Sequence, residues 1–367
     1  MLQAGLVTAL GTMSGTSLDG VDAAIVVTDG VEIAALGPTI YRPYRDDEQA
    51  FLRAHLGLWR DDDVTVASQF IAWAHWEAIY ALGHVDICGF HGQTLAHDPG
   101  GRGTHQCGNG QDLADALGYP VVWDFRSADV AAGGQGAPLA PFYHFALAKW
   151  IGAQEPVVFL NLGGVGNLTW VDPSFADPAD DGALLAFDTG PANAPINDLM
   201  MARRGVTHDV DGALAGIGKV DVDVIAEFMQ HPYFAKTPPK SLDRDSFVGV
   251  VDAVANLPDA DAAATLAWAV VASVGQAMAQ CPAPPSRVLV SGGGRLNRTI
   301  MAGLAHALKC DVAAVEKVGL SGDMLEAQAF AYLAVRVARG LPISAPQTTG
   351  IPLAATGGAI AFPQDNA

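Results

Sequence analysis

The chain is short of positive charge. Its 367 residues include 20 Lys and Arg against 39 Asp and Glu, which gives a formal net charge of −19 at pH 7. General nucleic-acid binding and docking on an anionic membrane both depend on clustered Lys and Arg, so the composition predicts neither partner. A polyanionic ligand would have to be bound locally, by backbone N–H groups, a metal ion or a few cations.

Cysteines and long apolar runs are also scarce. The four cysteines lie far apart without the paired short spacing of a zinc site, so we expect free thiols in a reducing compartment, the cytoplasm. Residues 1–11 contain no basic segment and no cleavage pattern, which argues against an export signal. The apolar run at residues 262–275 is shorter than the roughly 20 residues that span a bilayer. We expect a buried helix there.

Three common site motifs are missing. The segment "GIGKV" at residues 216–220 lacks the upstream glycine and the following Ser or Thr of a P-loop. No GxGxxG follows a predicted strand, and Ser14 misses the GxSxG pattern by one position. The sequence therefore predicts none of the standard P-loop, Rossmann or hydrolase sites.

The first part of the chain alternates apolar runs with helical patterns. Two Asp-Gly pairs, Asp19-Gly20 and Asp29-Gly30, separate three short apolar runs and predict an antiparallel meander over residues 6–10, 21–27 and 31–36. Helices are expected at residues 66–83, 109–118 and 142–152, and strands at residues 85–90 and 120–125. Strands that alternate with helices of this length indicate the α/β class.

The second part restates this plan. An apolar strand, a glycine-rich polar turn and a second strand occupy residues 156–172, and a further strand ends in an acid at residues 183–191. The acidic insert between them, residues 172–182, is expected to be an exposed hairpin tip. Glycine and proline at residues 130–141 suggest a boundary, so we predict domains 1–131 and 132–367, with a C-terminal tail that could pack back on the first. Two such halves would face each other across one cleft.

The turn at residues 11–19 holds more hydroxyls and glycines than a plain hairpin requires. Its hydroxyls and bare backbone N–H groups suit phosphate oxygens, and Asp19 suits the water shell of a magnesium ion. The alternative is a serine-rich hairpin without a ligand. The residues in question are Gly11, Thr12, Ser14, Gly15, Thr16, Ser17 and Asp19.

A second glycine cluster, Gly292, Gly293 and Gly294, follows a short apolar strand and precedes an amphipathic helix. Such a junction can expose a helix N-terminus to a nucleotide, and Asn297 could add an amide contact. A tight strand-to-helix turn without a ligand is the alternative.

Two acids are candidate catalytic residues. Asp188 follows an apolar strand where the chain turns, and could act as a general base, hold a metal or merely cap the next helix. At helical spacing Glu326 shares an apolar face with Phe330, while Arg336 takes the other side and Ser321 is the expected N-cap. A glutamate on an apolar face is costly unless it is paired or used.

A third group of candidate site residues is polar, and we expect it to recognise a sugar or a carboxylate. A zinc site is not expected, because His91, His97 and His105 lack the spacing of zinc ligands. A proline-rich loop carries Lys236, Lys240 and Arg244, either as a mobile anion-contacting flap or as a static strap between lobes. The third group comprises His91, Gln93, Thr94, Arg126 and Asp129.

Eight ordered motifs closely resemble those of the anhydro-N-acetylmuramic acid kinase family. The resemblance covers nearly the whole chain. It implies the duplicated, ribonuclease-H-like lobes of the actin, sugar-kinase and heat-shock ATPase superfamily, with mixed sheets flanked by helices around a nucleotide cleft. The motifs are "GTMSGTSLDGVD", "HGQTLAHDP", "DFRSADVAAGGQGAPLAP", "NLGGVGNLT", "FDTGPAN", "HPYFAKTPPKS", "VSGGGRLN" and "GLSGDMLEAQAFAYLA".

The resemblance implies an ATP- and Mg²⁺-dependent enzyme of cell-wall recycling. It would open 1,6-anhydro-N-acetylmuramic acid with water and phosphorylate O6, giving N-acetylmuramic acid 6-phosphate. Asp188 would activate the water, and Glu326 would orient the water or bind the sugar. ATP would be held by residues 11–19, by Gly163, Gly164 and Asn167, and by Gly292 to Gly294 with Asn297; His91, Gln93, Thr94 and Arg126 look like sugar contacts.

One residue departs from the family pattern, because Ala192 stands where the family usually has the glycine after "DTGP". The added methyl and the loss of easy positive φ predict reduced turnover or an altered sugar pocket. The resemblance further implies a homodimer. Two alternatives stay open: a kinase of another sugar or acid without ring opening, and an ATP-operated binding or scaffold protein.

Overall fold

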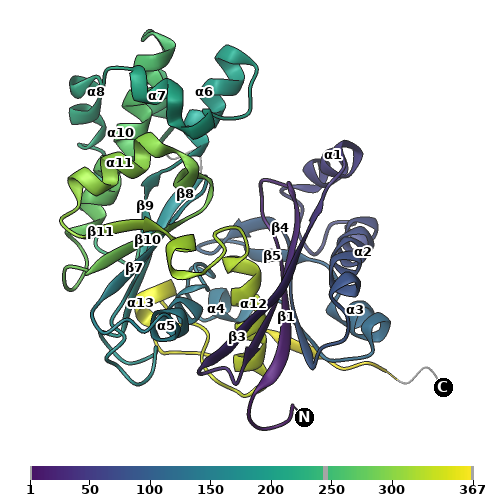
Figure 1. The fold of residues 1–367 in the computed structure, drawn as a ribbon. Coiled ribbons are helices and arrows are strands. Elements are labelled where there is room, and N and C mark those ends of the chain that lie inside the picture. Colours follow the sequence, from purple (N-terminus) through teal and green to yellow (C-terminus); the bar gives the residue numbers. More distant parts are fainter. Residues whose placement is uncertain (1, 243–246, 365–367) are drawn as a thin grey trace. The chain divides into compact units, whose positions relative to one another are not determined.

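The computed structural model describes residues 2–242 and 247–364 and divides the chain into two compact units. Unit 1 comprises Met1–Gly152 and Asp323–Ala367, and unit 2 comprises Ala153–Gly322. Both ends of the chain therefore contribute to unit 1, which Figure 1 shows as purple, blue and yellow segments lying together. The boundary falls at residue 152 and not at residue 131, because helix α5 (Pro141–Trp150) packs against elements of unit 1.

Unit 1 is built on a seven-stranded mixed sheet with the order β12-β6-β4-β1-β2-β3, and β5 pairs with β4. The three central strands β1, β4 and β6 are parallel, and β2 and β3 complete the antiparallel meander predicted from the sequence. The C-terminal strand β12 pairs with β6, so the tail packs on unit 1. The strands are β1 (Val7–Ser14), β2 (Gly20–Thr28), β3 (Ile33–Pro43), β4 (Ile87–Asp98), β5 (Gly103–Cys107), β6 (Val121–Trp123) and β12 (Ala359–Ala361).

The first hairpin is wider than predicted. Strand β1 continues to Ser14, the connection spans residues 15–19, and the positive φ falls on Leu18 at 60° instead of on the Asp19-Gly20 pair. Leu18 is 1% exposed, and burial of its side chain offsets the strained backbone. Gly20 is needed for space, because a Cβ there would lie 2.4 Å from the carbonyl oxygen of Arg42.

Helices cover both faces of this sheet. Helices α2 and α3 share one core with the sheet, and α12 crosses the other face over β1, β2 and β4 (Figure 1). Helix α12 begins at Leu325 with Met324 at the N-cap position, so the prediction that Ser321 caps this helix was wrong. Arg336 is buried, not on an outer side, since α12 is covered nearly all round. The helices are α1 (Asp46–His55), α2 (Thr65–Leu82), α3 (Gly110–Leu117), α4 (Ser127–Ala131), α5, α12 (Leu325–Ala338) and α13 (Pro346–Thr349).

Unit 2 repeats the strand order of unit 1. Its five-stranded sheet runs β11-β10-β7-β8-β9, where β7, β8 and β9 form an antiparallel meander and β10 and β11 are parallel to β7. This matches β6-β4-β1-β2-β3, so the duplicated α/β plan is confirmed. The strands are β7 (Val157–Leu162), β8 (Val165–Val171), β9 (Leu184–Pro191), β10 (Arg287–Ser291) and β11 (Asp311–Ala314).

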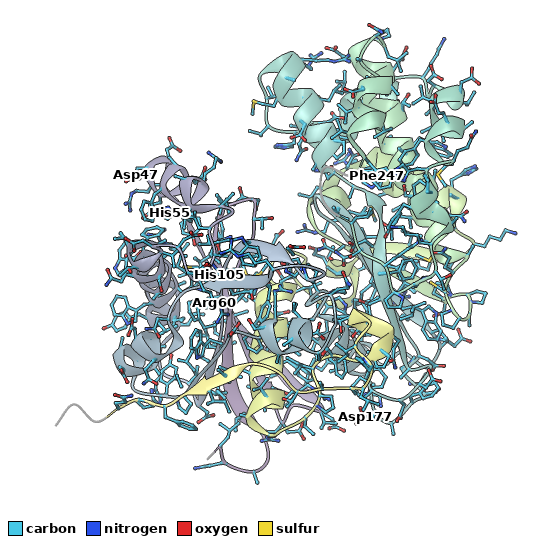
Figure 2. The ribbon with its side chains drawn as sticks, turned by 180° about the vertical axis from the view of Figure 1, so that it is seen from behind. Asp47, His55, Arg60, His105, Asp177 and Phe247 are labelled. Atoms are coloured by element: carbon cyan, nitrogen blue, oxygen red, sulfur yellow. The ribbon has the colours of Figure 1, made fainter. Side chains whose placement is uncertain are left out.

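The helices of unit 2 pack around α10 (Asp259–Met278). This apolar helix is mostly buried, as predicted for residues 262–275, and no helix of the described residues is long and apolar enough to cross a membrane. The insert at residues 172–182 joins β8 to β9 as an exposed tip, where Figure 2 labels Asp177. The other helices are α6 (Ala194–Arg204), α7 (Ala213–Ile217), α8 (Val222–Phe228), α9 (Val248–Ala253) and α11 (Arg298–Ala307), with short 3₁₀ turns η1 (Val210–Gly212), η2 (Pro232–Ala235), η4 (Gly293–Leu296) and η5 (Val315–Val318).

Candidate functional site

The polar loop at residues 15–19 leaves the C-terminal end of β1, at the edge where the parallel strands β1 and β6 end and β4 continues to Asp98. Thr16, Ser17 and Asp19 are exposed, while Leu18 anchors the loop in the core. A Cβ on Gly15 would meet only the Ser17 hydroxyl, at 3.6 Å. The loop thus presents hydroxyls and little-hindered backbone to solvent, as a phosphate-binding loop requires.

Gln93 supports this loop from β4. Its side-chain oxygen accepts a hydrogen bond from Ser14 Oγ at 2.6 Å, and its Nε2 donates to the carbonyl oxygen of Gly15 at 3.1 Å. Tyr44 Oη lies 3.1 Å from Ser14 Oγ, and burial raises the pKa of Tyr44 to about 12. Ser14 and Gln93 are buried, so both act within the protein as braces of the loop.

Two residues of the predicted phosphate group lie deeper. Thr12 is fully buried, and its Oγ1 lies 2.8 Å from His75 Nδ1 and 3.4 Å from the carbonyl oxygen of Gly89. A Cβ on Gly11 would lie 2.1 Å from the carbonyl oxygen of Ala327 in α12. Gly11 therefore lets α12 approach the sheet, and it offers no obvious path to a ligand.

Four carboxylates of unit 1 are close enough for their charges to interact. Burial and the negative charges of Glu326, Asp323 and Asp19 raise the pKa of Asp22 to about 7. Glu326 is exposed, yet surrounding protein displaces water and raises its pKa, while the positive charge of Arg126 opposes this shift. Asp22 was not among the predicted site residues, although the spacing "DGVD" places it three residues after Asp19.

A magnesium ion fits this charge distribution. No cluster of three or more His, Cys, Asp or Glu in the described part of the chain could hold a metal by itself. Mg²⁺, however, usually takes one or two carboxylates together with waters and substrate phosphates. Excess negative charge at Asp22, next to the exposed Asp19 loop, provides that donor set.

Arg126 and His91 form a pair over Phe330 of α12. The Arg126 guanidinium donates to His91 Nε2 from Nε at 3.2 Å and from Nη2 at 3.0 Å, and His91 Nδ1 lies 2.8 Å from the carbonyl oxygen of Gly92. Burial and the charge of Arg126 hold the pKa of His91 well below its usual range, so this histidine is neutral. The pair places a cation near Glu326, as a polar substrate site requires.

Asp129 and Thr94 have partners within unit 1. The Asp129 carboxylate accepts hydrogen bonds from the N–H of Gly136 and from Thr349 Oγ1, both at 2.6 Å, so it braces the loop before α5. Thr94 lies opposite Gln106 across β4 and β5, and its Oγ1 accepts from Gln106 Nε2 at 3.4 Å. No motif in the sequence points to Gln106.

In unit 2 both glycine clusters lie at one edge. Strands β7 and β10 are parallel neighbours, and Gly163 and Gly164 follow the first as Gly292 to Gly294 follow the second. Gly164 and Gly293 are exposed. Gly292 has φ +73°, and a Cβ on Gly294 would lie 2.6 Å from Leu162 Cβ, so close packing demands both.

Asn297 is the N-cap of α11. Its Oδ1 accepts hydrogen bonds from the backbone N–H groups of Thr299 and Ile300. The 3₁₀ turn η4 separates the glycines from this helix, so α11 does not begin directly after them as predicted. Nδ2 of Asn297 is buried without a hydrogen-bond partner in the structure. The oxygen therefore stabilises the helix, and only the amide nitrogen is left for another contact.

Asp188 lies in β9 directly opposite Asn167 of β8. Its Oδ2 accepts a hydrogen bond from the backbone N–H of Leu242 at 2.8 Å, and its own N–H donates to the carbonyl oxygen of Lys240 at 3.0 Å. Tyr233 Oη donates to the carbonyl oxygen of Asp188 at 2.5 Å. A half-buried carboxylate held this firmly has the position control that a general base needs. Arg244, the third cation of the predicted loop, lies outside the described residues.

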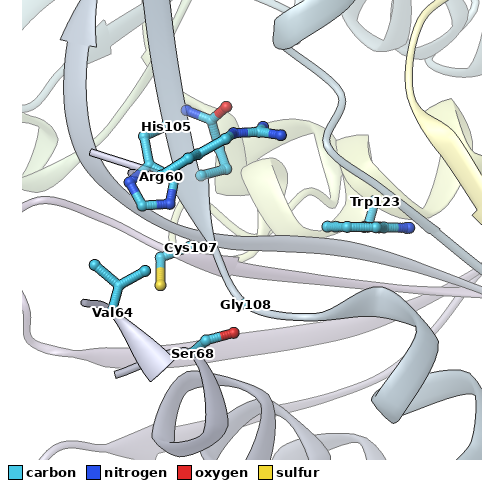
Figure 3. Close-up of a pocket in the computed structure, with 8 residues that line it drawn as sticks. Arg60, Val64, Ser68, His105, Cys107, Gly108 and Trp123 are labelled. Carbon is cyan, nitrogen blue, oxygen red and sulfur yellow. The ribbon is translucent and has the colours of Figure 1, made fainter. Parts of the chain in front are cut away.

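A separate pocket of about 160 Å³ opens in unit 1 and contains none of the predicted residues (Figure 3). His105 and Cys107 of β5 face Ser68 and Val64 of the α2 region there. Burial lowers the pKa of His105 and raises that of Cys107 to about 11. A protonated thiol is a poor nucleophile, so the pocket offers no evident catalytic group.

The fold defines the class of α/β proteins with a duplicated strand order, in which each unit has glycines and polar residues at the C-terminal ends of its parallel strands. The family model described as anhydro-N-acetylmuramic acid kinase matches residues 7–363. The chain belongs to the anhydro-N-acetylmuramic acid kinase family. It is 62% identical to the anhydro-N-acetylmuramic acid kinase of Cereibacter sphaeroides over 99% of this chain and 98% of that protein. It is 58% identical to the one from Roseobacter denitrificans over 98% and 95%.

Solved sugar-kinase structures are far more distant. The ROK family glucokinase from Streptomyces griseus, in complex with glucose and AMPPNP, is 14% identical with a TM-score of 0.42 over 90% of this chain and 99% of that chain. The xylulose kinase from Lactobacillus acidophilus is 12% identical with a TM-score of 0.47 over 97% and 94%. No functional conclusion follows from likenesses this distant.

Proposed function

We propose that the protein is an ATP-dependent kinase that opens 1,6-anhydro-N-acetylmuramic acid with water and phosphorylates O6. The products are N-acetylmuramic acid 6-phosphate and ADP, and the setting is peptidoglycan recycling. The observation that carries the proposal is membership of the kinase family across residues 7–363, a range that contains every candidate site residue. Because ATP is a cytoplasmic substrate, we expect the protein to work in the cytoplasm.

ATP binding falls to the glycine and hydroxyl segments. The loop at residues 15–19 donates backbone N–H groups and hydroxyls to the phosphates, and the exposed Gly164 and Gly293 allow close approach of the nucleotide. Asp19 and Asp22 would hold Mg²⁺. When bound, the ion neutralises charge that develops on the transferring phosphoryl group.

Sugar binding falls to unit 1. Arg126 is fixed by His91 and by the carbonyl oxygen of Gly136, to which Nη1 donates at 2.8 Å. Its remaining positive field and the carboxylate of Glu326 suit the hydroxyl, amide and acid groups of an amino sugar acid. Gln93 contributes indirectly, because it holds the phosphate loop next to this site.

The reaction needs one base. Asp188 takes a proton from the water while the water oxygen bonds to the anomeric carbon. The bond from that carbon to O6 breaks at the same time. O6 then attacks the γ-phosphorus, and the bond to ADP breaks. Phosphoryl transfer depends mainly on positioning and charge stabilisation, so the contacts that fix Asp188 are part of the catalytic apparatus.

The test uses isotope-labelled water. Purified protein is incubated with ATP, Mg²⁺ and 1,6-anhydro-N-acetylmuramic acid in ¹⁸O-water, and the product is weighed by mass spectrometry. We expect a phosphorylated sugar with one ¹⁸O at the anomeric carbon. Phosphorylation without the label would favour a kinase that leaves the ring closed, and slow ATP hydrolysis indifferent to sugar would favour a scaffold protein.

Replacement of the proposed base separates chemistry from binding. Asp188→Asn should lower kcat by about 10²- to 10⁴-fold, the usual contribution of a general base, and leave ATP affinity within threefold. Asp177→Asn makes the same chemical change on the exposed insert and should behave as wild type. Substantial turnover in Asp188→Asn would remove Asp188 from the role of base.

The oligomeric state is a separate prediction. Family resemblance implies a homodimer, and light scattering of the purified protein across a tenfold range of concentration measures it. A constant mass near the 38.0 kDa of one chain would contradict the dimer.

A further inference from the structure

Asp188 is held at three atoms by the segment from Tyr233 to Leu242. The Leu242 N–H reaches the carboxylate, the Lys240 carbonyl oxygen accepts the Asp188 N–H, and the Tyr233 hydroxyl reaches the Asp188 carbonyl oxygen. The distances are 2.8, 3.0 and 2.5 Å in that order. Backbone and side chain of Asp188 are thus fixed together, which leaves little freedom for its carboxylate.

These contacts occupy the free edge of the sheet. Strand β9 is the last strand of the order β11-β10-β7-β8-β9, so no strand of the described residues pairs with its outer side. The segment at residues 240–242 lies along this edge and takes up the Asp188 N–H that would otherwise lack a partner strand. One carboxylate oxygen of Asp188 accepts from the segment as well, which fixes the direction of the other.

Lys240 ties the segment to Tyr233. Its ammonium donates to the Tyr233 carbonyl oxygen at 3.2 Å and lies 4.6 Å from the centre of the Tyr233 ring and 5.6 Å from that of Phe187. A cation over an aromatic face is attracted to the ring, and more strongly where water is excluded. Lys240 is half-buried and forms no ion pair with a carboxylate among the described residues. The charge of Lys240 therefore interacts mainly with Tyr233 and holds it in place.

Tyr233 is itself fixed by packing against other residues of unit 2. Its ring meets that of Phe247 edge-on at 5.9 Å, in an aromatic cluster where Figure 2 labels Phe247. Gln280 of the chain after α10 donates to the carbonyl oxygens of Phe234 and Lys236. Burial and the charge of Asp188 raise the pKa of Tyr233, so its hydroxyl stays protonated and remains a donor. Packing and hydrogen bonds therefore brace the segment along its length.

We propose that Tyr233 and Lys240 are positioning residues for Asp188, and that this segment is a static strap within unit 2 that fixes the direction of the base. The inference rests on the proposed function, in which Asp188 activates the water. Neither residue needs to touch a substrate for this role. A base misplaced by about 1 Å can cost on the order of 100-fold in rate.

Kinetics of single variants give the first test. Tyr233→Phe removes the donor to the Asp188 carbonyl oxygen, and Lys240→Met removes the charge while keeping side-chain length. Each should lower kcat by about 10- to 100-fold and leave KM for ATP and sugar within threefold. Lys240→Arg should restore most of the rate. Lys309→Met is the matched control, because it makes the same change at an exposed lysine of unit 2 that lies outside the segment from Tyr233 to Leu242.

A double-mutant cycle distinguishes positioning from general damage. In an Asp188→Asn background, Tyr233→Phe and Lys240→Met should cost less than threefold, since they act through the group already removed. The same loss in both backgrounds would overturn the proposal. Wild-type kinetics in both single variants would overturn it as well.

Hydrogen exchange provides a readout that does not depend on turnover. In Tyr233→Phe and Lys240→Met, the amides of residues 236–242 and of β9 should exchange at least tenfold faster than in wild type, while unit 1 is unchanged. Unchanged exchange would show that the strap is not held by these residues. If wild type fails to phosphorylate the sugar while the exchange result is as expected, the proposed function fails and the strap stands.

Discussion

Ala192 occupies the position where the family resemblance leads one to expect glycine, and its backbone does not require one. Among the described residues it is not one of those with positive φ, and its N–H donates to the carbonyl oxygen of Gly164 at 3.3 Å. The methyl is 1% exposed and belongs to the core of unit 2 with Leu162 and Ile196. The residue therefore fits its surroundings, against the concern raised by the sequence.

Reversion to glycine should accordingly bring no gain in rate. Ala192→Gly should leave kcat within threefold of wild type and lower the free energy of unfolding by about 1 kcal/mol, from the lost methyl and the freer unfolded backbone. Michaelis kinetics and urea unfolding measure the two effects. A kcat raised tenfold or more would mean that the methyl obstructs the sugar.

Glu326 is the second residue whose role can be tested alone. Because the carboxylate is exposed and faces the field of Arg126, Glu326→Gln should leave the fold intact and weaken sugar binding or kcat by about 10- to 100-fold. Circular dichroism provides the folding control. Wild-type kinetics would return Glu326 to a structural role.

At the scale of elements, one glycine of β1 is required for packing, whereas a glycine of the following loop is open to a ligand. Gly11 lies under α12, where a Cβ would overlap the helix backbone, so Gly11→Ala should destabilise unit 1 by about 3 kcal/mol or more. Gly15 meets only a serine hydroxyl, so Gly15→Ala should keep the melting temperature within about 3 °C yet weaken ATP binding. Thermal melting and calorimetric titration with an ATP analogue separate the two.

Equal destabilisation by both substitutions would contradict this division of duties. The informative comparison is the difference between the two alanine variants, since each adds the same methyl group, one within β1 and one in the loop that follows it.

The elements themselves were largely predictable from the sequence, because apolar periodicity and Asp-Gly turns are local signals. The meander of β1 to β3 and the buried helix α10 are confirmed. The length of β4 was not predictable: its polar end, from Gln93 to Asp98, pairs with β5, and pairing satisfies a backbone that composition alone assigns to a loop.

Candidate site residues were harder to assign individually. The glycines and hydroxyls were identified as a set, but whether each faces a ligand depends on packing across the chain. Gly11 serves α12, and Asn297 caps α11, and both duties arise from partners fixed by the fold. Tyr233 and Leu242 were missed as partners of Asp188, because a contact between a loop and a strand 45 or more residues away has no local signature.

At the scale of the whole molecule, three buried histidines predict acid sensitivity. Burial lowers the pKa of His75 and of His144 to about 3, and the pKa of His91 lies well below its usual value. In the unfolded chain each takes up a proton near pH 6.5, so the stability present above that pH is lost as pH falls. Each histidine should cost roughly 1.4 kcal/mol per pH unit.

Asp22 acts in the opposite direction. Its pKa is raised to about 7, so the native state binds its proton more tightly and gains stability as pH falls from 7 towards 4. One partly exposed carboxyl offsets at most one histidine, so the net free energy of unfolding should fall between pH 6.5 and 5.5. Urea unfolding at both values measures it, and a constant or rising stability would refute the expectation.

Unit 1 is assembled from two stretches of chain, residues 1–152 and 323–367, with unit 2 between them. The ribosome therefore completes every residue of unit 2 before it makes α12, the helix that covers one face of the first sheet. During synthesis one face of the sheet that contains β1 to β6 therefore stays uncovered until α12 is made, while unit 2 can already fold. The order of biosynthesis is thus reversed in folding: the segment made first is the last to be completed, and its exposed glycine-lined sheet is the part of the nascent chain in most need of protection.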